Sequence, residues 1–227
     1  MKKVISILLF LLGAISLTGC SASRSTEKNT ITSQTSNTSL NNTTFSVNYE
    51  DFHADYPHYG TIDEMKEKAN LVFVGTVRSI TFELLDMYTM KPIDNLDSAG
   101  FPLINTIYEV EVNHAYSDMS DTIVKVRIEG GMREQMLDEQ VATAKSNTIV
   151  VQDDAPSLTS GESYLFAVYL ADNANYASIV NPFQSIYSLE NIDAKSDVQV
   201  FSAADIMSSY SDNAVWEFQN QKGEWMK

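Results

Sequence analysis

The sequence has little of several residue types, and each shortage narrows what this 227-residue chain can be. A single cysteine excludes a disulfide framework within the chain. Only 15 basic residues stand against 30 acidic ones, and a net charge of −15 lacks the basic footprint that nucleic-acid binding requires. The remaining balance, 44% hydrophobic and 20% charged, is that of a globular protein. We therefore expect a globular chain with no nucleic-acid partner.

The chain also lacks a hydrophobic run long enough to cross a bilayer. Its longest apolar stretch, Val4 to Leu17, is shorter than the roughly 20 residues that a transmembrane helix needs. Lys2 and Lys3 precede this stretch, and small residues follow it. A basic start, a short apolar centre and a small-residue end are typical of a secretory signal, so residues 1–19 are interpreted as a signal peptide.

The signal ends in Leu17-Thr18-Gly19-Cys20, which resembles the lipobox of bacterial lipoproteins. The resemblance implies cleavage before Cys20, attachment of a diacylglycerol to its thiol and further acylation, for example by palmitate, of its amino group. Two or more acyl chains give stable attachment to a membrane, where one does not. We therefore expect a lipid-anchored protein on the extracytoplasmic face of the cell membrane. Frequent Asn, Lys and Ser favour a Gram-positive source.

A polar segment separates this anchor from the rest of the chain. Residues 20–44 are dominated by Ser, Thr, Asn and Gln and contain no aromatic residue. Such a segment buries too little apolar surface to offset the entropy of ordering it. The sequence thus predicts a lipidated cysteine followed by a flexible spacer, and a single folded domain over residues 45–227.

Local patterns in the folded part predict mainly strands. A capping-box pattern, Thr61-x-x-Glu64, predicts a helix that starts near residue 61. Gly75 marks a bend in a long strand. The predicted helices cover 61–69, 132–145 and 203–210, a loop covers 88–104, and the strands cover 71–85, 108–112, 124–128, 164–170, 176–180 and 185–189. This order favours a five-stranded OB-like Greek-key barrel with a helix between strands 3 and 4 and short flanking helices.

Several segments resemble the netrin-like module, an OB-fold shared with tissue inhibitors of metalloproteinases. They are 69–77, the strand 108–112, the Ile128-Glu129-Gly130-Gly131 stop, and Leu158-x-x-Gly161-Glu162-x-Tyr164. The resemblance spans about residues 68 to 190 and implies the fold alone. In the animal inhibitors a free N-terminal cysteine reaches the protease metal, whereas Cys20 would be acylated and distant. Protease inhibition is therefore not expected here.

The best candidate for a chemical site is the acidic and histidine-containing segment 50–59. Histidine nitrogens and carboxylate oxygens suit zinc or a similar divalent ion. Asp51, His53 and Asp55 would share one face of an extended strand, with His58 nearby. The alternative is a solvated stretch whose aromatic residues dock on the domain. The pair Asp153 and Asp154 is explained by turn chemistry.

Motifs of the common enzyme classes are missing. The sequence has no Gly-x-Ser-x-Gly, Walker or His-Glu-x-x-His motif, and no cofactor is predicted. The favoured hypothesis is a non-enzymatic binding module that holds an envelope protein or glycan through a barrel face and the 88–104 loop. A metal-dependent protein using Asp51, His53, Asp55 and His58, and a small hydrolase with an unrecognised site, stay open as alternatives.

Overall fold

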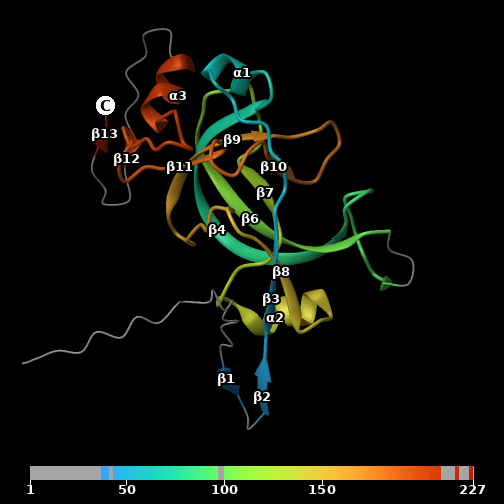
Figure 1. The fold of residues 1–227 in the computed structure, drawn as a ribbon. Helices are drawn as coiled ribbons and strands as arrows, with labels where there is room; N and C mark the ends of the chain where they lie inside the picture. The colour runs from blue at the N-terminus through green and yellow to red at the C-terminus, as the bar shows by residue number, and fades with distance from the viewer. Residues whose placement is uncertain (1–36, 41–42, 97–99, 211–217, 220–224, 227) are drawn as a thin grey trace, which may run out of the picture. The chain divides into compact units, whose positions relative to one another are not determined.

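A computed structural model of the chain describes residues 37–40, 43–96, 100–210, 218–219 and 225–226 (Figure 1). Two compact units divide the chain, Met1–Gln34 and Thr35–Lys227, and every described residue belongs to the second. Cys20 and the predicted signal peptide lie outside the described residues. Among the helices that are described, none is long and apolar enough to span a membrane.

The fold is mainly β, as the sequence predicts. Three short helices are present in the described residues: α1 (Ile62–Lys66), α2 (Leu137–Ala144) and α3 (Ala203–Tyr210). The strands are β1 (Asn37–Leu40), β2 (Thr43–Ser46), β3 (Asn48–Phe52), β4 (Leu71–Asp86), β5 (Lys91–Pro92), β6 (Pro102–Ala115), β7 (Ile123–Glu129), β8 (Thr148–Gln152), β9 (Ser163–Tyr169), β10 (Ala177–Ile179), β11 (Ile186–Ser188), β12 (Phe218–Gln219) and β13 (Trp225–Met226).

A seven-stranded sheet dominates the molecule, in the order β11-β9-β10-β7-β6-β4-β5. β9 also pairs with β4, so the pairings lead from β4 through β6, β7, β10 and β9 back to β4. Within this sheet β10 and β7 are parallel, and the other pairs are antiparallel. The long β4 therefore bonds to β6 along one edge and to β9 along the other.

Alternating apolar side chains of these strands form the largest core cluster. The Phe73 and Phe166 rings stack there with centroids 5.0 Å apart. The pairing of β4 with β6 shifts register between Val74 and Gly75, which confirms the predicted irregularity at this glycine. A Cβ on Gly75 would lie 2.5 Å from Val110 Cγ1, so only glycine lets the two strands approach this closely.

The helices complete two smaller clusters. α1 begins at the predicted capping box, in which Thr61 accepts from the Glu64 amide and the Glu64 side chain accepts from the Thr61 amide. Met65 of α1 and Ile206 of α3 are fully buried in one cluster, and both helices lie at the same end of the molecule in Figure 1. α2 lies beside β3 and β8, and Ile149 of β8 is buried in the second of these clusters.

Three elements differ from the sequence expectation. The helix expected over 132–145 begins at Leu137, because Glu134 and Met136 have positive φ angles of 57° and 45°, which interrupt a right-handed helix. The expected loop 88–104 contains β5 and ends where β6 begins at Pro102. A parallel pair of β3 with β8 was not anticipated.

The two ends of the described chain add short strand pairs. β1 and β2 pair antiparallel within the segment predicted to be a flexible spacer. Threonine, which favours extended backbone, makes up half of β2. β12 pairs with β13 near the C-terminus. The sequence also predicts that Val215 and Trp216 cover an exposed face of the core, and both residues lie outside the described part of the chain.

Candidate functional site

The structure places the four predicted metal ligands in two different environments. Asp51 lies in β3, where its carboxylate pairs with the guanidinium of Arg133. The sequence suggested that His53 and Asp55 lie on one face of this strand. Because β3 ends at Phe52, both residues lie beyond the strand instead. His53, Asp55 and His58 line a common hollow that Asp51 does not line. The four residues are therefore not assembled as one ligand set.

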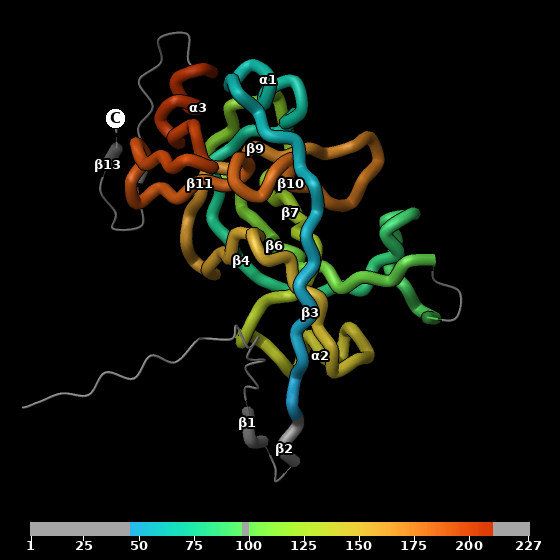
Figure 2. The backbone as a smooth tube through the Cα atoms, viewed as in Figure 1, coloured from blue at the N-terminus to red at the C-terminus, as the bar shows by residue number. Residues whose placement is uncertain are grey.

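No three His, Cys, Asp or Glu side chains in the described part of the chain are grouped so that they could hold a metal ion. Asp154 nevertheless joins His53, Asp55 and His58 as a lining residue of the hollow next to β3. Asp154 follows β8, and the parallel pairing of β3 with β8 ends both strands at the same level, at Phe52 and Gln152. Figure 2 shows β8 beside β3 and the chain continuing from β3 toward α1.

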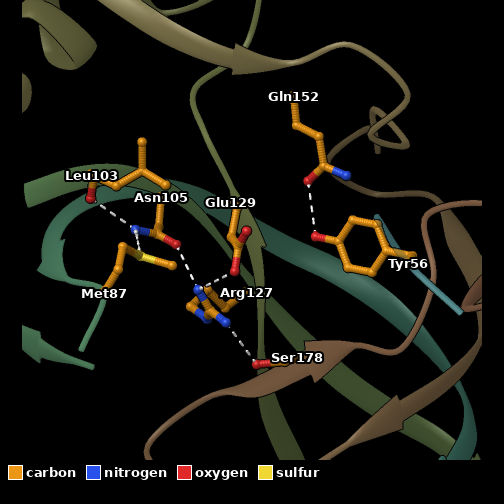
Figure 3. A network of polar contacts seen from close by, with 8 residues as sticks. All are labelled: Tyr56, Met87, Leu103, Asn105, Arg127, Glu129, Gln152 and Ser178. Atoms are coloured by element: carbon orange, nitrogen blue, oxygen red, sulfur yellow. Dashed lines mark hydrogen bonds and ion pairs between the residues drawn. The ribbon is translucent and has the colours of Figure 1, made fainter. Parts of the chain in front are cut away.

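A buried polar network lies next to this hollow (Figure 3). Arg127 is only 7% exposed, and its guanidinium donates to Asn105 Oδ1 at 2.9 Å and to Ser178 Oγ at 3.0 Å. Glu129 places a carboxylate oxygen 3.4 Å from the guanidinium. A buried guanidinium with this set of partners is satisfied without a ligand, and it ties β6, β7 and β10 together.

Tyr56 lies close to Glu129 of this network and also lines the hollow. Its hydroxyl donates to Gln152 Oε1 at 3.4 Å, and both residues line the hollow. Burial of the phenol, followed by the nearby negative charge of Glu129, raises the pKa of Tyr56 to about 12. Tyr56 is therefore neutral at physiological pH and acts here as a hydrogen-bond donor.

The second notable feature is the hairpin between β4 and β6. Four of its large hydrophobic side chains face solvent: Tyr88 is 80% exposed, Phe101 54%, Met90 40% and Leu96 40%. Tyr88 and Phe101 lie next to each other, with ring centroids 6.3 Å apart. We call this set of four residues the hairpin patch. Apolar side chains that are exposed next to each other, as Tyr88 and Phe101 are, mark interaction sites more often than singly exposed ones do.

The base of this hairpin is held by one carboxylate. Asp86 accepts the amide N–H groups of Tyr88 and Gly100, each at 2.8 Å, and that of Thr89 at 3.2 Å. These N–H groups, that of Gly100 first, hold the pKa of Asp86 below its ordinary value of 3.8. Asp86 thus fixes the backbone at Tyr88 and at Gly100, which precedes Phe101 of the hairpin patch.

Sequence reasoning found part of these features. It selected the 88–104 loop and the segment 50–59, but it interpreted Asp154 only as a turn residue. The run Thr148-Ile149-Val150-Val151 carried a strand signal that could have placed Asp154 at the end of β8. The parallel pairing of this run with β3 joins segments that are distant in the sequence. It places Asp154 and His53 in the lining of the same hollow.

Comparison with known proteins finds no relative. No family model, no curated protein and no solved structure matches the chain.

Proposed function

We propose that this protein is a lipid-anchored binding module of the cell envelope, which holds a partner protein through the hairpin patch. One observation carries the proposal: Tyr88, Met90, Leu96 and Phe101 expose apolar surface from a hairpin whose base is fixed by Asp86. Exposing these side chains to water is unfavourable, and an ordered hairpin loses little conformational entropy when a partner covers them.

The anchoring part of the proposal rests on the sequence of the N-terminus. A signal peptide that ends at Leu17-Thr18-Gly19-Cys20 supports lipidation of Cys20 and a position on the extracytoplasmic face of the cell membrane, in a Gram-positive bacterium. The polar residues that follow Cys20 would separate the domain from the membrane. The protein acts, in this proposal, by binding and not by catalysis.

The fold part of the proposal is an OB-like Greek-key barrel of the netrin-like kind. Its five strands would be β4, β6, β7, β9 and β10, and the support is the closed circuit of pairings among them, including the parallel β7–β10 pair. α2 falls between the third and fourth of these strands, where the OB order expects a helix. In this arrangement the hairpin patch belongs to the connection between the first two strands.

The chemistry of the hairpin patch favours a protein over a glycan as the partner. Tyr88 offers a ring on which a sugar could stack, but Met90 and Leu96 offer flexible aliphatic surface with no hydrogen-bonding group. Aromatic and Met side chains are enriched where proteins contact proteins. The patch is small, so it would supply the centre of an interface whose rim lies on the neighbouring strands.

Site-specific photo-crosslinking in the native cells tests this function. The full chain would carry a photoreactive phenylalanine at Tyr88, and a matched version would carry it at Tyr169, another tyrosine that is 47% exposed. We expect one dominant envelope-protein adduct from position 88 and none from position 169. The double variant Tyr88→Ser, Phe101→Ser should lose co-purification of that same protein. Equal adducts from both positions, or no adduct from position 88, would contradict the proposal.

A further inference from the structure

The hollow beside β3 is a second place where this protein offers groups to a ligand. It has a volume of about 270 Å³ and lies between the segment 52–58 and the turn 181–183, with Gln152, Asp154 and Val198 completing its lining. Neither the hairpin patch nor Asp86 contributes to it. The hollow is therefore a site separate from the one on which the proposed function rests.

Buried side chains fix both walls of the hollow. Gln184 is fully buried, and its amide group accepts from the Tyr59 N–H and donates to the Tyr59 carbonyl, each at 2.9 Å. The Asn181 amide donates to the Pro57 carbonyl at 2.8 Å and accepts from the Phe183 N–H at 2.7 Å. These bonds hold the segment 57–59 against the turn 181–183, so the hollow is formed before any ligand arrives.

Four polar side chains line the hollow and make no bond within the described protein. His53, Asp55, His58 and Asp154 are all exposed, and no hydrogen bond or ion pair joins any of them to another described residue. By contrast, the neighbouring Asp51 and Asp153 both contact Arg133. The carboxylates in the hollow are thus available, whereas those just outside it share an ion pair with Arg133.

The charge of the hollow indicates which ligands it would accept. Neither Lys nor Arg is among its lining residues, so Asp55 and Asp154 give it an uncompensated negative charge. Apolar walls accompany this charge, because Phe52, Phe183 and the 46% exposed Val198 also line it. Carboxylates accept from N–H donors and attract cations, and aromatic rings attract cations over their faces. Anionic ligands would be repelled.

We propose that this hollow binds an organic ammonium group, supplied by a free amine or by a lysine side chain. The ammonium donates to the carboxylates of Asp55 and Asp154, and its methylene stem packs against Phe52 and Phe183. A single metal ion fits less well, because no three potential ligands among the described residues are grouped to hold one. An extended ligand spans the hollow instead.

Titration of the full chain in detergent with defined amines tests this site. The probes are 1,5-diaminopentane, for a free amine, and Nα-acetyl-lysine amide, for a lysine side chain. Nα-acetyl-norleucine amide keeps the stem without the charge. We expect saturable binding of at least one amine and none of the norleucine compound. Because a charge-assisted hydrogen bond is lost, Asp55→Asn and Asp154→Asn should each weaken binding about tenfold.

Asp51→Asn is the matched control, because it removes the same charge from the same segment outside the hollow. It should bind the amine as the native chain does, which separates a site from general attraction to an acidic protein. Asp55 and Asp154 have no partner in the described part, so their variants should keep the native melting temperature. Tyr88→Ser should not change amine binding, so this inference and the proposed function fail independently.

Three results would overturn the inference. Equal binding of the norleucine compound would show an apolar site. Equal weakening by Asp51→Asn, Asp55→Asn and Asp154→Asn would show general electrostatic attraction. Saturable binding of zinc or calcium that Asp55→Asn abolishes, with no amine binding, would assign the hollow to a metal ion. Chemical shifts of the His53 and His58 rings on titration provide a readout that does not depend on any variant.

Discussion

The Gly100 amide donates to the carboxylate of Asp86 at 2.8 Å, across the base of the hairpin that carries the exposed apolar patch. Asp86 lies at the last pair of β4 with β6, where it is opposite Pro102. The Tyr88 ring packs over Gly100, since a Cβ added there would lie 2.9 Å from Tyr88 Cδ2. One carboxylate thus positions both ends of the loop and the most exposed aromatic side chain of the hairpin patch.

Removing this carboxylate should loosen the hairpin without unfolding the domain. In Asp86→Ala the amides of Tyr88 and Gly100 lose their acceptor, so their hydrogen exchange should become faster, while exchange in β9 stays slow. Asp94→Ala is the control, because the Asp94 side chain has no partner among the described residues. Unchanged exchange in Asp86→Ala would show that backbone pairing alone holds the hairpin.

The order of the hairpin should also depend on pH in the acid range. The folded-state pKa of Asp86 lies below its ordinary value of 3.8, so its ionised form is favoured by folding. This contribution is complete above the ordinary pKa and is lost as the pH falls through the lower, folded-state value. The amide resonances of Gly100 and Tyr88 should therefore shift together below pH 3.8. A midpoint at or above 3.8 would contradict the assigned hydrogen bonds.

Gly75 should tolerate no side chain, because its strand approaches β6 too closely. An alanine Cβ would lie 2.5 Å from Val110 Cγ1 and 2.8 Å from the Glu111 carbonyl oxygen. Overpacking of this kind costs about 1–3 kcal/mol, so urea denaturation of Gly75→Ala should show a clearly lower midpoint. Gly60→Ala is the matched control, since its nearest atom would be the Glu64 carboxylate at 3.6 Å. Equal midpoints for the two variants would show that β4 and β6 separate easily.

Arg127 should be more important for stability than an exposed arginine. Arg127→Ala leaves Asn105 and Glu129 without the guanidinium that they contact inside the protein, and loss of one partner from a buried pair costs about 3–5 kcal/mol. Arg78, whose side chain is 49% exposed, pairs with Glu111 at the surface, so Arg78→Ala should change stability little. Thermal unfolding of both variants compares the two sites. A small effect at Arg127 would mean that water replaces the guanidinium.

Features encoded by neighbouring residues were predicted well. The capping box of Thr61 and Glu64 needs only residues three apart, and the structure contains both of its hydrogen bonds. The nearly continuous apolar run at 164–170 predicted a strand buried on both faces, and β9 is buried from Tyr164 to Val168. The end helix over 203–210 matches α3 in both bounds.

Features that depend on contacts between distant segments were not predicted from the sequence. Parallel pairing of β3 with β8 joins residues about 100 positions apart, and no local pattern specifies it. The positive φ angles of Glu134 and Met136 delay α2, although the apolar spacing there continues a helical pattern. The hollow depends on Gln184 and Asn181, which bond to the backbone at Tyr59 and Pro57 more than 120 residues earlier.

The sequence by itself determined the mainly β class, the residues of the strands that alternate, and the starts of α1 and α3, because each depends on a short run of side chains. The tertiary structure decided which carboxylates contact a basic side chain and which do not. Asp51 contacts Arg133, whereas Asp55 and Asp154 line a hollow that has no Lys or Arg among its described lining residues. Charge neutralisation depends on distance in space, and distance in space is set by the packing of segments that the sequence separates.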